Sequence, residues 1–415
     1  MKLSVSLRRF KLALHWQILT GILLGILFGI LFPEYIHYTK WAGDLFLRGL
    51  KMVVIPLVFS ALIMGICSVG KAADLGRIAG KTFAWYVVTT LLASTLGLLL
   101  VNFFRPGEKV DLRLQETVTD IAATGNSFMD QIVAIVPDNI VQAMAEGQML
   151  PVIFFAILFG FFINVSTEKT QTLLTDVFNG IYEVMIGITF LVIRFAPIGL
   201  FGVASNMVGA QAGDPKALGV MFGSLGIYSA IIAGGCVLHG LLTIPGLFTL
   251  LTRKNPFTFM KMMGTALLTG FTTASSAASL PISLRDIQEK AGVSRKIAGF
   301  CLPLGNTINM NGTALFECVT AIFIAQVYGI ELTIVQQIII VLTSLMAAIG
   351  AAGIPLAGLV MLAVVLKAVG LPLEGIGLVL VVQQPLDMIR TSVNIWGDMT
   401  GAAIVAHSEG EKLNF

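Results

Sequence analysis

Long apolar stretches separated by short polar interruptions run along most of this chain. A stretch of about 18 or more apolar residues is long enough to cross the hydrocarbon core of a bilayer as a helix. The longest polar interruption, from about residue 105 to 130, is too short to bury a core of its own. The first part of the chain is therefore predicted to form six membrane helices, over residues 12–33, 42–69, 78–104, 135–165, 172–208 and 217–252.

From residue 255 onward, small residues interrupt the apolar pattern twice. Runs of alanine, glycine, serine, threonine and isoleucine occupy 272–279 and 347–353, and Pro281 and Pro355 follow them closely. A straight membrane helix would not carry helix-weakening residues and a proline near its centre. Each segment is therefore predicted to enter the membrane, turn at mid-depth and leave on the same side. Two broken segments in corresponding places of inverted halves are typical of a transporter's binding site.

The positions of lysine and arginine test this topology. With an internal N-terminus and two re-entrant segments, sixteen basic residues fall on the internal side and five on the external side. This asymmetry favours cytoplasmic N- and C-termini and an external loop after the third helix. We expect a multi-pass protein of the cell membrane, specifically the inner membrane of a prokaryote.

The composition agrees with a membrane protein, because 56% of the residues are hydrophobic and only 12% are charged. The four cysteines form no CxxC pair and are interpreted as core thiols. No HExxH or GxSxG motif occurs and the four histidines are scattered, so neither an enzyme nor an enzymatic cofactor is expected. Gly21, Gly25 and Gly29 recur every four residues in the first helix, a spacing that lets another helix approach closely.

The final predicted helix carries polar residues where the membrane centre should be. At about 100° per residue they fall on one stripe. The stripe consists of Gln383, Asp387, Arg390, Thr391, Asn394 and Asp398. Each charged member costs about 2.5–3.5 kcal/mol to insert, so the stripe must face protein or water. It offers a guanidinium fork and carboxylates to a ligand; the alternative is an internal Asp387–Arg390 ion pair that only holds the helix.

The preceding helix contains a polar segment, 305–313, that is uncharged, rich in oxygen ligands and bracketed by glycines. Hard cations such as sodium require several carbonyl, amide and carboxylate oxygens at once, and unwound backbone supplies them. The same density of polar groups also fits hydrogen bonding between helices. From the residues alone, both interpretations stay open.

Several of these segments resemble the dicarboxylate/amino acid:cation symporters, and more narrowly the glutamate and aspartate transporter homologues. The resemblance rests on Asn309–Thr313, Asp387–Asp398, the pair Ser275-Ser276 and the tripeptide Gly353-Ile354-Pro355. It covers nearly the whole chain. It implies an all-α fold of eight transmembrane helices plus two re-entrant hairpins, arranged as inverted repeats. It also implies a homotrimer in which each subunit moves a transport domain across the membrane like an elevator.

The resemblance implies a division of the chain into four parts. Residues 1–75 would form the first two scaffold helices, and 76–134 the third helix with its external loop. Residues 135–252 would contain scaffold helices four and five with transport-domain helix six. Residues 253–415 would form the transport core, in the order hairpin 1, helix 7, hairpin 2 and helix 8.

The resemblance also assigns binding residues, which divide into one substrate set and three cation sets. The substrate set is Ser275, Ser276, Thr313, Ile354, Gly358, Asp387, Arg390, Thr391 and Asn394. One sodium site would use Gly305, Asn309, Asn394 and Asp398, and a second Thr307 with Ala348, Ile349 and Ala351. In the family a third site uses the positions of Tyr86, Thr89, Thr90, Asn309 and Asn311.

Three departures from the family's pattern alter these expectations. The aspartate of the family's Asn-Met-Asp-Gly motif is Asn311 here, so the third cation site is expected to be weak or empty. A second position, early in the last helix, is acidic in the family and is Gln383 here. Family members place a second arginine at the position of Ala274 or of Met388, and this chain has it at neither.

The main hypothesis is a sodium-driven symporter for acidic amino acids in a lipid membrane. Alternatives within the fold are a proton- or sodium-coupled transporter of a C4-dicarboxylate or of a small neutral amino acid. Asp387 disfavours the former, since a dicarboxylate has no ammonium group, and Arg390 disfavours the latter. An anion channel is an alternative of another class, disfavoured by the absence of a charged pore ring in the sequence. The sequence leaves open aspartate against glutamate and the number of coupled cations.

Overall fold

The computed structural model describes residues 14–71, 76–108, 133, 135–350 and 357–415, and within these ranges every regular element is helical. Among the described residues, five helices are long and apolar enough to cross a membrane. They span His37–Cys67, Arg77–Phe104, Glu168–Arg194, Pro215–Thr252 and Arg295–Val327. The predicted all-helical fold is confirmed. The remaining apolar helices are shorter, because turns and breaks divide the segments in which they lie.

The helices lie in two parts of the chain, before and after residue 255. The first part contains α1 (Leu14–Leu31), α2 (His37–Lys71), α3 (Arg77–Phe104), α5 (Ile140–Glu146), α6 (Met149–Asn164), α7 (Glu168–Arg194), α8 (Ala196–Gly209), α9 (Pro215–Leu238), a π-helical turn η4 (His239–Thr243) and α10 (Ile244–Thr252). The second part contains α11 (Pro256–Met262), α12 (Gly264–Thr273), α13 (Ser276–Glu289), α14 (Arg295–Ile308), α15 (Asn311–Val327), α16 (Ile334–Gly350), α17 (Ala357–Ala368), η5 (Leu373–Gly375), α18 (Ile376–Leu380) and α19 (Gln383–Ser408). Short 3-10 turns, such as η1 (Pro33–Tyr35), join some of them.

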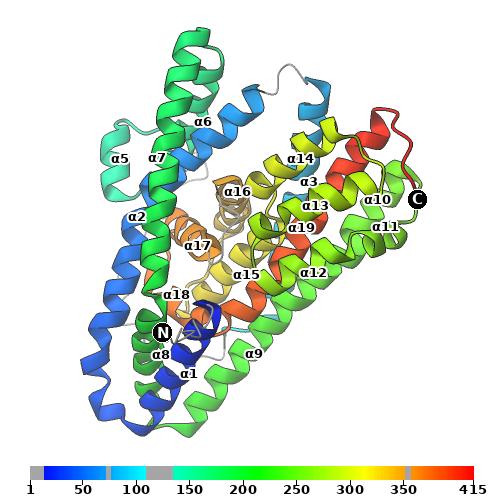
Figure 1. Ribbon diagram of the computed structural model, residues 1–415. Helices are drawn as coiled ribbons and strands as arrows, with labels where there is room; N and C mark the ends of the chain where they lie inside the picture. Colours follow the sequence, from blue (N-terminus) through cyan, green and yellow to red (C-terminus); the bar gives the residue numbers. More distant parts are fainter. Residues whose placement is uncertain (1–13, 72–75, 109–132, 134, 351–356) are drawn as a thin grey trace, which may run out of the picture.

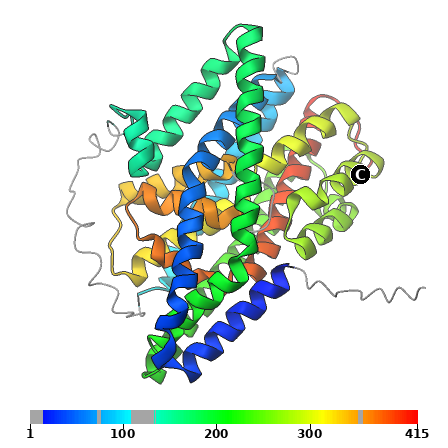
Figure 2. The same cartoon turned by 60° about the vertical axis from the view of Figure 1, so that its left-hand side comes forward.

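One group of helices is built around α2, which packs against α6, α7 and α8, while α1 lies along α8 (Figures 1 and 2). The α1–α8 contact is made by backbone. A methyl group added at Gly29 would lie 2.6 Å from the carbonyl oxygen of Ser205 and 2.9 Å from the amide nitrogen of Gly209. Gly21 and Gly25 face α8 backbone in the same way. The predicted close approach of another helix at these glycines is confirmed.

A second group surrounds α19, which contacts α3, α9, α10, α12, α13, α14 and α15. In Figure 1 this group occupies the right-hand side, with α12 and α13 beside α19. α3 packs mainly on α15, and α16 and α17 pair with each other and cover the same helix. The polar stripe of the last helix is therefore enclosed by protein. All six of its members are buried, with at most 7% of the residue surface exposed.

Two segments predicted as single helices are divided in the structure. Residues 135–165 form α5 and α6, because Gly147 takes a left-handed conformation (φ 73°) that ends α5. Residues 172–208 form α7 and α8, which break at Phe195, and Pro197 stands in the first turn of α8. An apolar run shows that a segment belongs in the membrane but not where its helix ends.

The first broken segment forms the predicted hairpin. α12 ends at Ala274, which has φ 48°, and the Ser275 side chain accepts a hydrogen bond from the amide of Ala278 to cap α13. Pro281 lies inside α13 and does not make the turn. The second segment forms α16 and α17, but its tip, including Ala351, Ile354 and Pro355, lies outside the described residues.

Ion pairs join elements that are distant in the sequence. Lys51 of α2 lies 2.9 Å from Glu374 of η5, and both side chains are exposed, by 39% and 63%. Glu409, just after α19, pairs with Arg77 and Lys81 at the start of α3. The hydrogen bond from Arg77, followed by that from Lys81, lowers the pKa of Glu409 to about 2.

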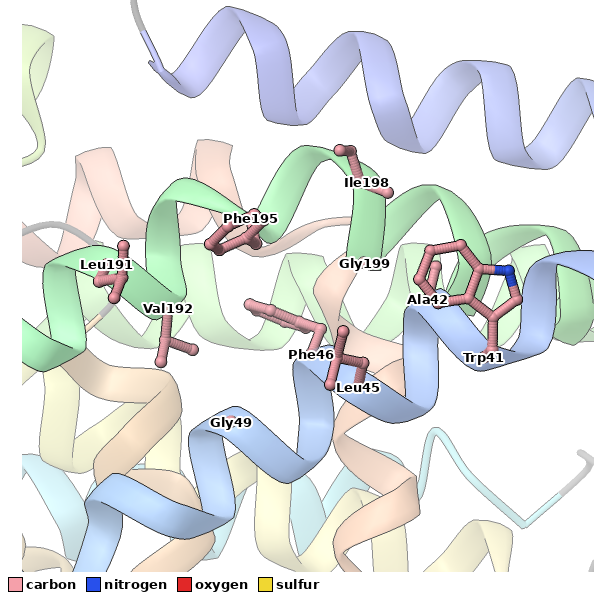
Figure 3. Close-up of a pocket in the computed structure, with 10 residues that line it drawn as sticks. All are labelled: Trp41, Ala42, Leu45, Phe46, Gly49, Leu191, Val192, Phe195, Ile198 and Gly199. Carbon is pink, nitrogen blue, oxygen red and sulfur yellow. The ribbon is translucent and has the colours of Figure 1, made fainter.

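An apolar groove of about 360 Å³ lies between α2 and the α7–α8 junction (Figure 3). Its walls include Trp41, Phe46 and Phe195, and none of its lining residues is charged. A charged solute would lose its hydration there without gaining a partner. The groove is therefore unsuited to an acidic ligand.

Candidate functional site

The site forms where a membrane helix unwinds. α14 ends at Ile308, and Asn309 and Met310 leave the helical conformation (φ −115°, ψ 74° and φ −108°, ψ 65°) before α15 begins at Asn311. A side chain of α19 forms a hydrogen bond with a backbone amide next to this break. The side-chain oxygen of Asn394 accepts a hydrogen bond from the amide of Gly312 at 2.8 Å. The unwound backbone that was one interpretation of the segment 305–313 occurs at these two residues.

A buried ion pair lies beside this break. Nη2 of Arg390 is 2.7 Å from Oδ1 of Asp387, one helical turn earlier, and Arg390 is 0% exposed. Nε and Nη1 of Arg390 have no hydrogen-bond partner among the described residues. The internal ion pair considered from sequence therefore exists, but it satisfies only part of the guanidinium. A buried donor without a partner is costly, so the remaining donors are candidates for binding an anionic group.

Two other helices, α15 and α17, lie against the guanidinium. Its central carbon lies 3.8 Å from the ring centre of Phe316, within cation–π range. A methyl group at Gly358 would lie 3.1 Å from Nη1 of Arg390 and 3.2 Å from Cγ2 of Thr313. Gly358 thus lets α17 approach the guanidinium closely, and α15, α17 and α19 together bound the candidate substrate site.

The other expected substrate residues are placed less uniformly. Thr313, Thr391 and Asn394 are buried, and the amide of Asn394 donates a hydrogen bond to the hydroxyl of Thr313 at 3.3 Å. Ser276, at the tip of hairpin 1, lines a small cavity that also contains Asp398. Ser275 caps α13, and Ile354 lies outside the described residues.

Asp398 lies close to most of its expected neighbours in the first cation set. Its Oδ1 accepts a hydrogen bond from Nδ2 of Asn309 at 2.7 Å. A methyl group at Gly305 would collide with that carboxylate and would lie 2.7 Å from the hydroxyl of Tyr86. This crowding requires glycine at 305, and it brings the backbone of α14 next to the carboxylate. A carboxylate beside the backbone of a helix that unwinds suits sodium.

The expected third cation set is also assembled, but its charge is missing. The Thr90 hydroxyl donates a hydrogen bond to Oδ1 of Asn311 at 2.8 Å, and Thr89 lies 3.5 Å from Asn309 and Asn311. The hydroxyl of Tyr86 donates to the carbonyl of Cys301 at 2.7 Å. Nδ2 of Asn311 has no acceptor among the described residues. An amide nitrogen repels a cation, so this position weakens the set electrostatically.

The second cation set is only partly described. The hydroxyl of Thr307 donates to the carbonyl of Leu304 at 2.8 Å. A methyl group at Gly65 would lie 3.3 Å from Ile349 and 3.7 Å from Ile308, so the ends of α14 and α16 lie near each other. Ala348 and Ile349 are buried, whereas Ala351 lies outside the described residues.

Two buried ionisable residues were missed by the sequence reasoning. Glu317 in α15 is 0% exposed, and both its carboxylate oxygens lack a partner among the described residues. His239 in η4 is equally buried, and neither ring nitrogen has a partner there. An ionisable residue inside an apolar stretch is a functional candidate by default. That signal was present in the sequence for both residues.

Comparison with known proteins identifies the family. The model of the sodium:dicarboxylate symporter family matches residues 14–408. The chain belongs to this family. A proton/sodium-glutamate symport protein of Bacillus caldotenax is 36% identical, with 97% of this chain and 96% of the relative covered. A proton/glutamate-aspartate symporter of Escherichia coli is 35% identical, with 97% and 94% covered. A neutral amino acid transporter B(0) of mouse is 36% identical, with 90% and 75% covered.

Membership of the sodium:dicarboxylate symporter family confirms the resemblance found in the sequence. It establishes a membrane transporter. The printed names of the relatives include both acidic and neutral amino acid carriers, and both protons and sodium. The choice of substrate and cation therefore depends on the residues of this chain.

Proposed function

We propose that the protein is a secondary active symporter that takes up acidic amino acids, L-aspartate or L-glutamate, with sodium. The observation that carries the proposal is the buried Asp387–Arg390 pair, in which Nε and Nη1 of Arg390 lack partners among the described residues. An acidic amino acid brings both complementary charges. Its α-ammonium group pairs with Asp387, and its side-chain carboxylate takes the fork of Arg390.

The same pair ranks the competing substrates. A C4-dicarboxylate has a carboxylate that can bind Arg390, but it has no ammonium group that can pair with Asp387 in place of the guanidinium. A small neutral amino acid has an ammonium group for Asp387 but leaves a fully buried guanidinium without an anion. An acidic amino acid satisfies both ends, and Asn394 with Thr313 supplies polar partners for its α-carboxylate.

Sodium is the proposed coupled cation because Asp398 combines a buried carboxylate with neighbouring backbone of α14. Thr307 with Ala348, Ile349 and Ala351 is the proposed second set. Proton coupling is the second candidate, and Glu317 favours it. A fully buried carboxyl without a partner among the described residues has a place to hold a proton without forming an ion.

The proposed mechanism is an elevator within a homotrimer. The packing of α2 with α6, α7 and α8, and of α19 with its own set of helices, supports a division into scaffold and transport domains. We assign residues 1–75 to the scaffold, together with the fourth and fifth membrane helices predicted within 135–252. We assign residues 253–415 to the transport core. The close packing of α3 on α15 supports counting the third helix of 76–134 with the transport domain. The eight-helix topology, inverted repeats, trimer and cytoplasmic termini rest on the resemblance and the charge bias.

Binding calorimetry of the purified protein tests this proposal. L-aspartate, L-glutamate, succinate and L-serine are titrated in sodium chloride and in choline chloride. We expect an acidic amino acid to bind at least tenfold more tightly than succinate or serine, and only with sodium. Tighter binding of succinate would overturn the substrate. Uptake into proteoliposomes that a proton gradient drives undiminished without sodium would replace sodium by protons.

A further inference from the structure

A second polar space lies on the hairpin 1 side of Asp398. It is a cavity of about 10 Å³ enclosed by α13, α14 and α19. Its polar lining consists of Ser276, Ser279, Ser283, Asn306 and Asp398. A space of this size holds a single water molecule or a small ion. The family-based expectations place Ser276 with the substrate and include no role for Ser279, Ser283 or Asn306.

The three serines reach the cavity from one face of one helix. They are spaced three and four residues apart along α13, which places them on the same side. All three are buried. The Ser279 hydroxyl donates to the backbone carbonyl of Ser276 at 3.0 Å, which leaves its oxygen available as an acceptor. Hairpin 1 therefore presents a row of hydroxyl oxygens to the cavity.

Asn306 and Asp398 complete the lining from the opposite helices. The side-chain oxygen Oδ1 of Asn306 is buried and has no donor among the described residues. A buried acceptor without a donor calls for an explanation such as an ion or a water. Asp398 is 5% exposed, and within the described ranges it forms no ion pair with a lysine, arginine or histidine.

These groups together favour a cation over water. The lining combines one carboxylate, one amide oxygen and several hydroxyl oxygens, the ligand types that hard cations prefer. A water molecule can donate only two hydrogen bonds, and when the backbone set at Gly305 and Asn309 is empty it leaves the carboxylate without a counter-charge. A monovalent ion satisfies the amide oxygen and neutralises the carboxylate at once. The small volume excludes an ion that keeps its full hydration shell.

We propose that this cavity binds one sodium ion, with Asn306 and the serines of α13 as ligands in addition to Asp398. This site rests on the proposed sodium coupling but is separate from the backbone set at Gly305 and Asn309. Asp398 borders both. An ion that leaves the backbone set toward hairpin 1 therefore meets a second set of oxygens next to the same carboxylate.

Equilibrium binding of radioactive sodium to the purified protein, without amino acid, tests the proposal. Asn306→Ala should raise the dissociation constant of one class of sodium ions at least tenfold, and Ser283→Ala at least threefold. Asn306→Asp should tighten the same class. Asn102→Ala is the matched control, because Asn102 bonds Gln337 outside the candidate site and its loss should leave sodium binding within twofold. Gel filtration and thermal melting check that each variant folds, and Ser283→Ala keeps the test intact if Asn306→Ala does not.

The outcomes separate this site from the proposed function. If Asn306→Ala and Ser283→Ala bind sodium within twofold of the parent while Asp398→Asn loses it, the cavity holds water and the proposal is overturned. Sodium coupling itself survives that result. If the parent binds no sodium at all, the proposed sodium coupling fails, and this site fails with it.

Discussion

Replacing Arg390 with methionine should separate acidic from neutral substrates. Methionine keeps much of the side-chain length and contacts the Phe316 ring, which lies 3.8 Å from the guanidinium carbon, so packing is largely retained. The change removes the charge that the structure leaves only partly satisfied. It also removes the hydrogen bond of 2.7 Å to Asp387.

The expected loss follows from the donors that Arg390 has available. Nε and Nη1 lack partners among the described residues and can make two charge-assisted hydrogen bonds to one carboxylate. At about 1.5–3 kcal/mol each, their loss weakens binding by about 3–6 kcal/mol. Since about 1.4 kcal/mol is a tenfold change in affinity, L-aspartate should bind about 10²–10⁴-fold more weakly.

Calorimetry in saturating sodium measures this loss, with L-aspartate, L-glutamate and L-serine as ligands. L-serine, which makes no carboxylate contact with Arg390, should change by less than tenfold or bind more tightly. Arg390→Lys is the conservative comparison, because a point charge replaces the fork, and it should fall between parent and Arg390→Met. Acidic amino acids that bound Arg390→Met within threefold of the parent would refute the assigned role.

Three other changes test separate parts of the molecule. Asn311→Asp restores a charge at the third cation set, so it should steepen the sodium dependence of aspartate binding. An unchanged Hill slope would count against the weakened site. So would a parent protein that already carries three sodium ions per substrate in proteoliposomes. Glu317→Gln tests the second candidate, proton coupling: it removes a proton-holding group, so any dependence of uptake on external pH that comes from proton coupling should disappear, and an unaltered pH profile would exclude Glu317 as the proton carrier. The pKa of Glu409 is depressed to about 2 from an ordinary 4.5, so its pairing with Arg77 stabilises the fold above pH 4.5 and is lost as the pH falls toward 2. The melting temperatures of parent and Glu409→Gln should therefore converge over that interval, and a gap that stayed constant would contradict the assignment.

The polar stripe of the last helix was predictable because helix geometry is local. Six residues separated by turns of one helix must share a face, and all six are buried in α19. Pro385 lies in the first turn of α19, where its missing amide costs little. The turn of hairpin 1 was likewise predicted from its small residues, although Ala274 and Ser275, and not Pro281, form it.

Other features depended on contacts that sequence spacing does not contain. The ends of α5 and α7 are set by Gly147 and by a break at Phe195, inside segments that the sequence predicted as single helices. Hydropathy is averaged over a window about as long as a membrane helix, so it does not locate such a break. Asn306 belongs to the polar segment 305–313, but its proximity to the serines of α13 arises only when hairpin 1 packs on α14.

Lys51 and Glu374 join the two helix groups through an ion pair. Both side chains of this pair are exposed to solvent. Such a pair contributes about 0–1 kcal/mol. In the proposed elevator, the need to break this pair would slow each movement by about fivefold at most. The contacts of α1 with α8, in contrast, are made by backbone at the glycines, so no side-chain rotation can release them. In the proposed elevator, in which one group moves against the other, this ion pair adds little resistance, and raising the salt concentration should speed turnover slightly by screening it.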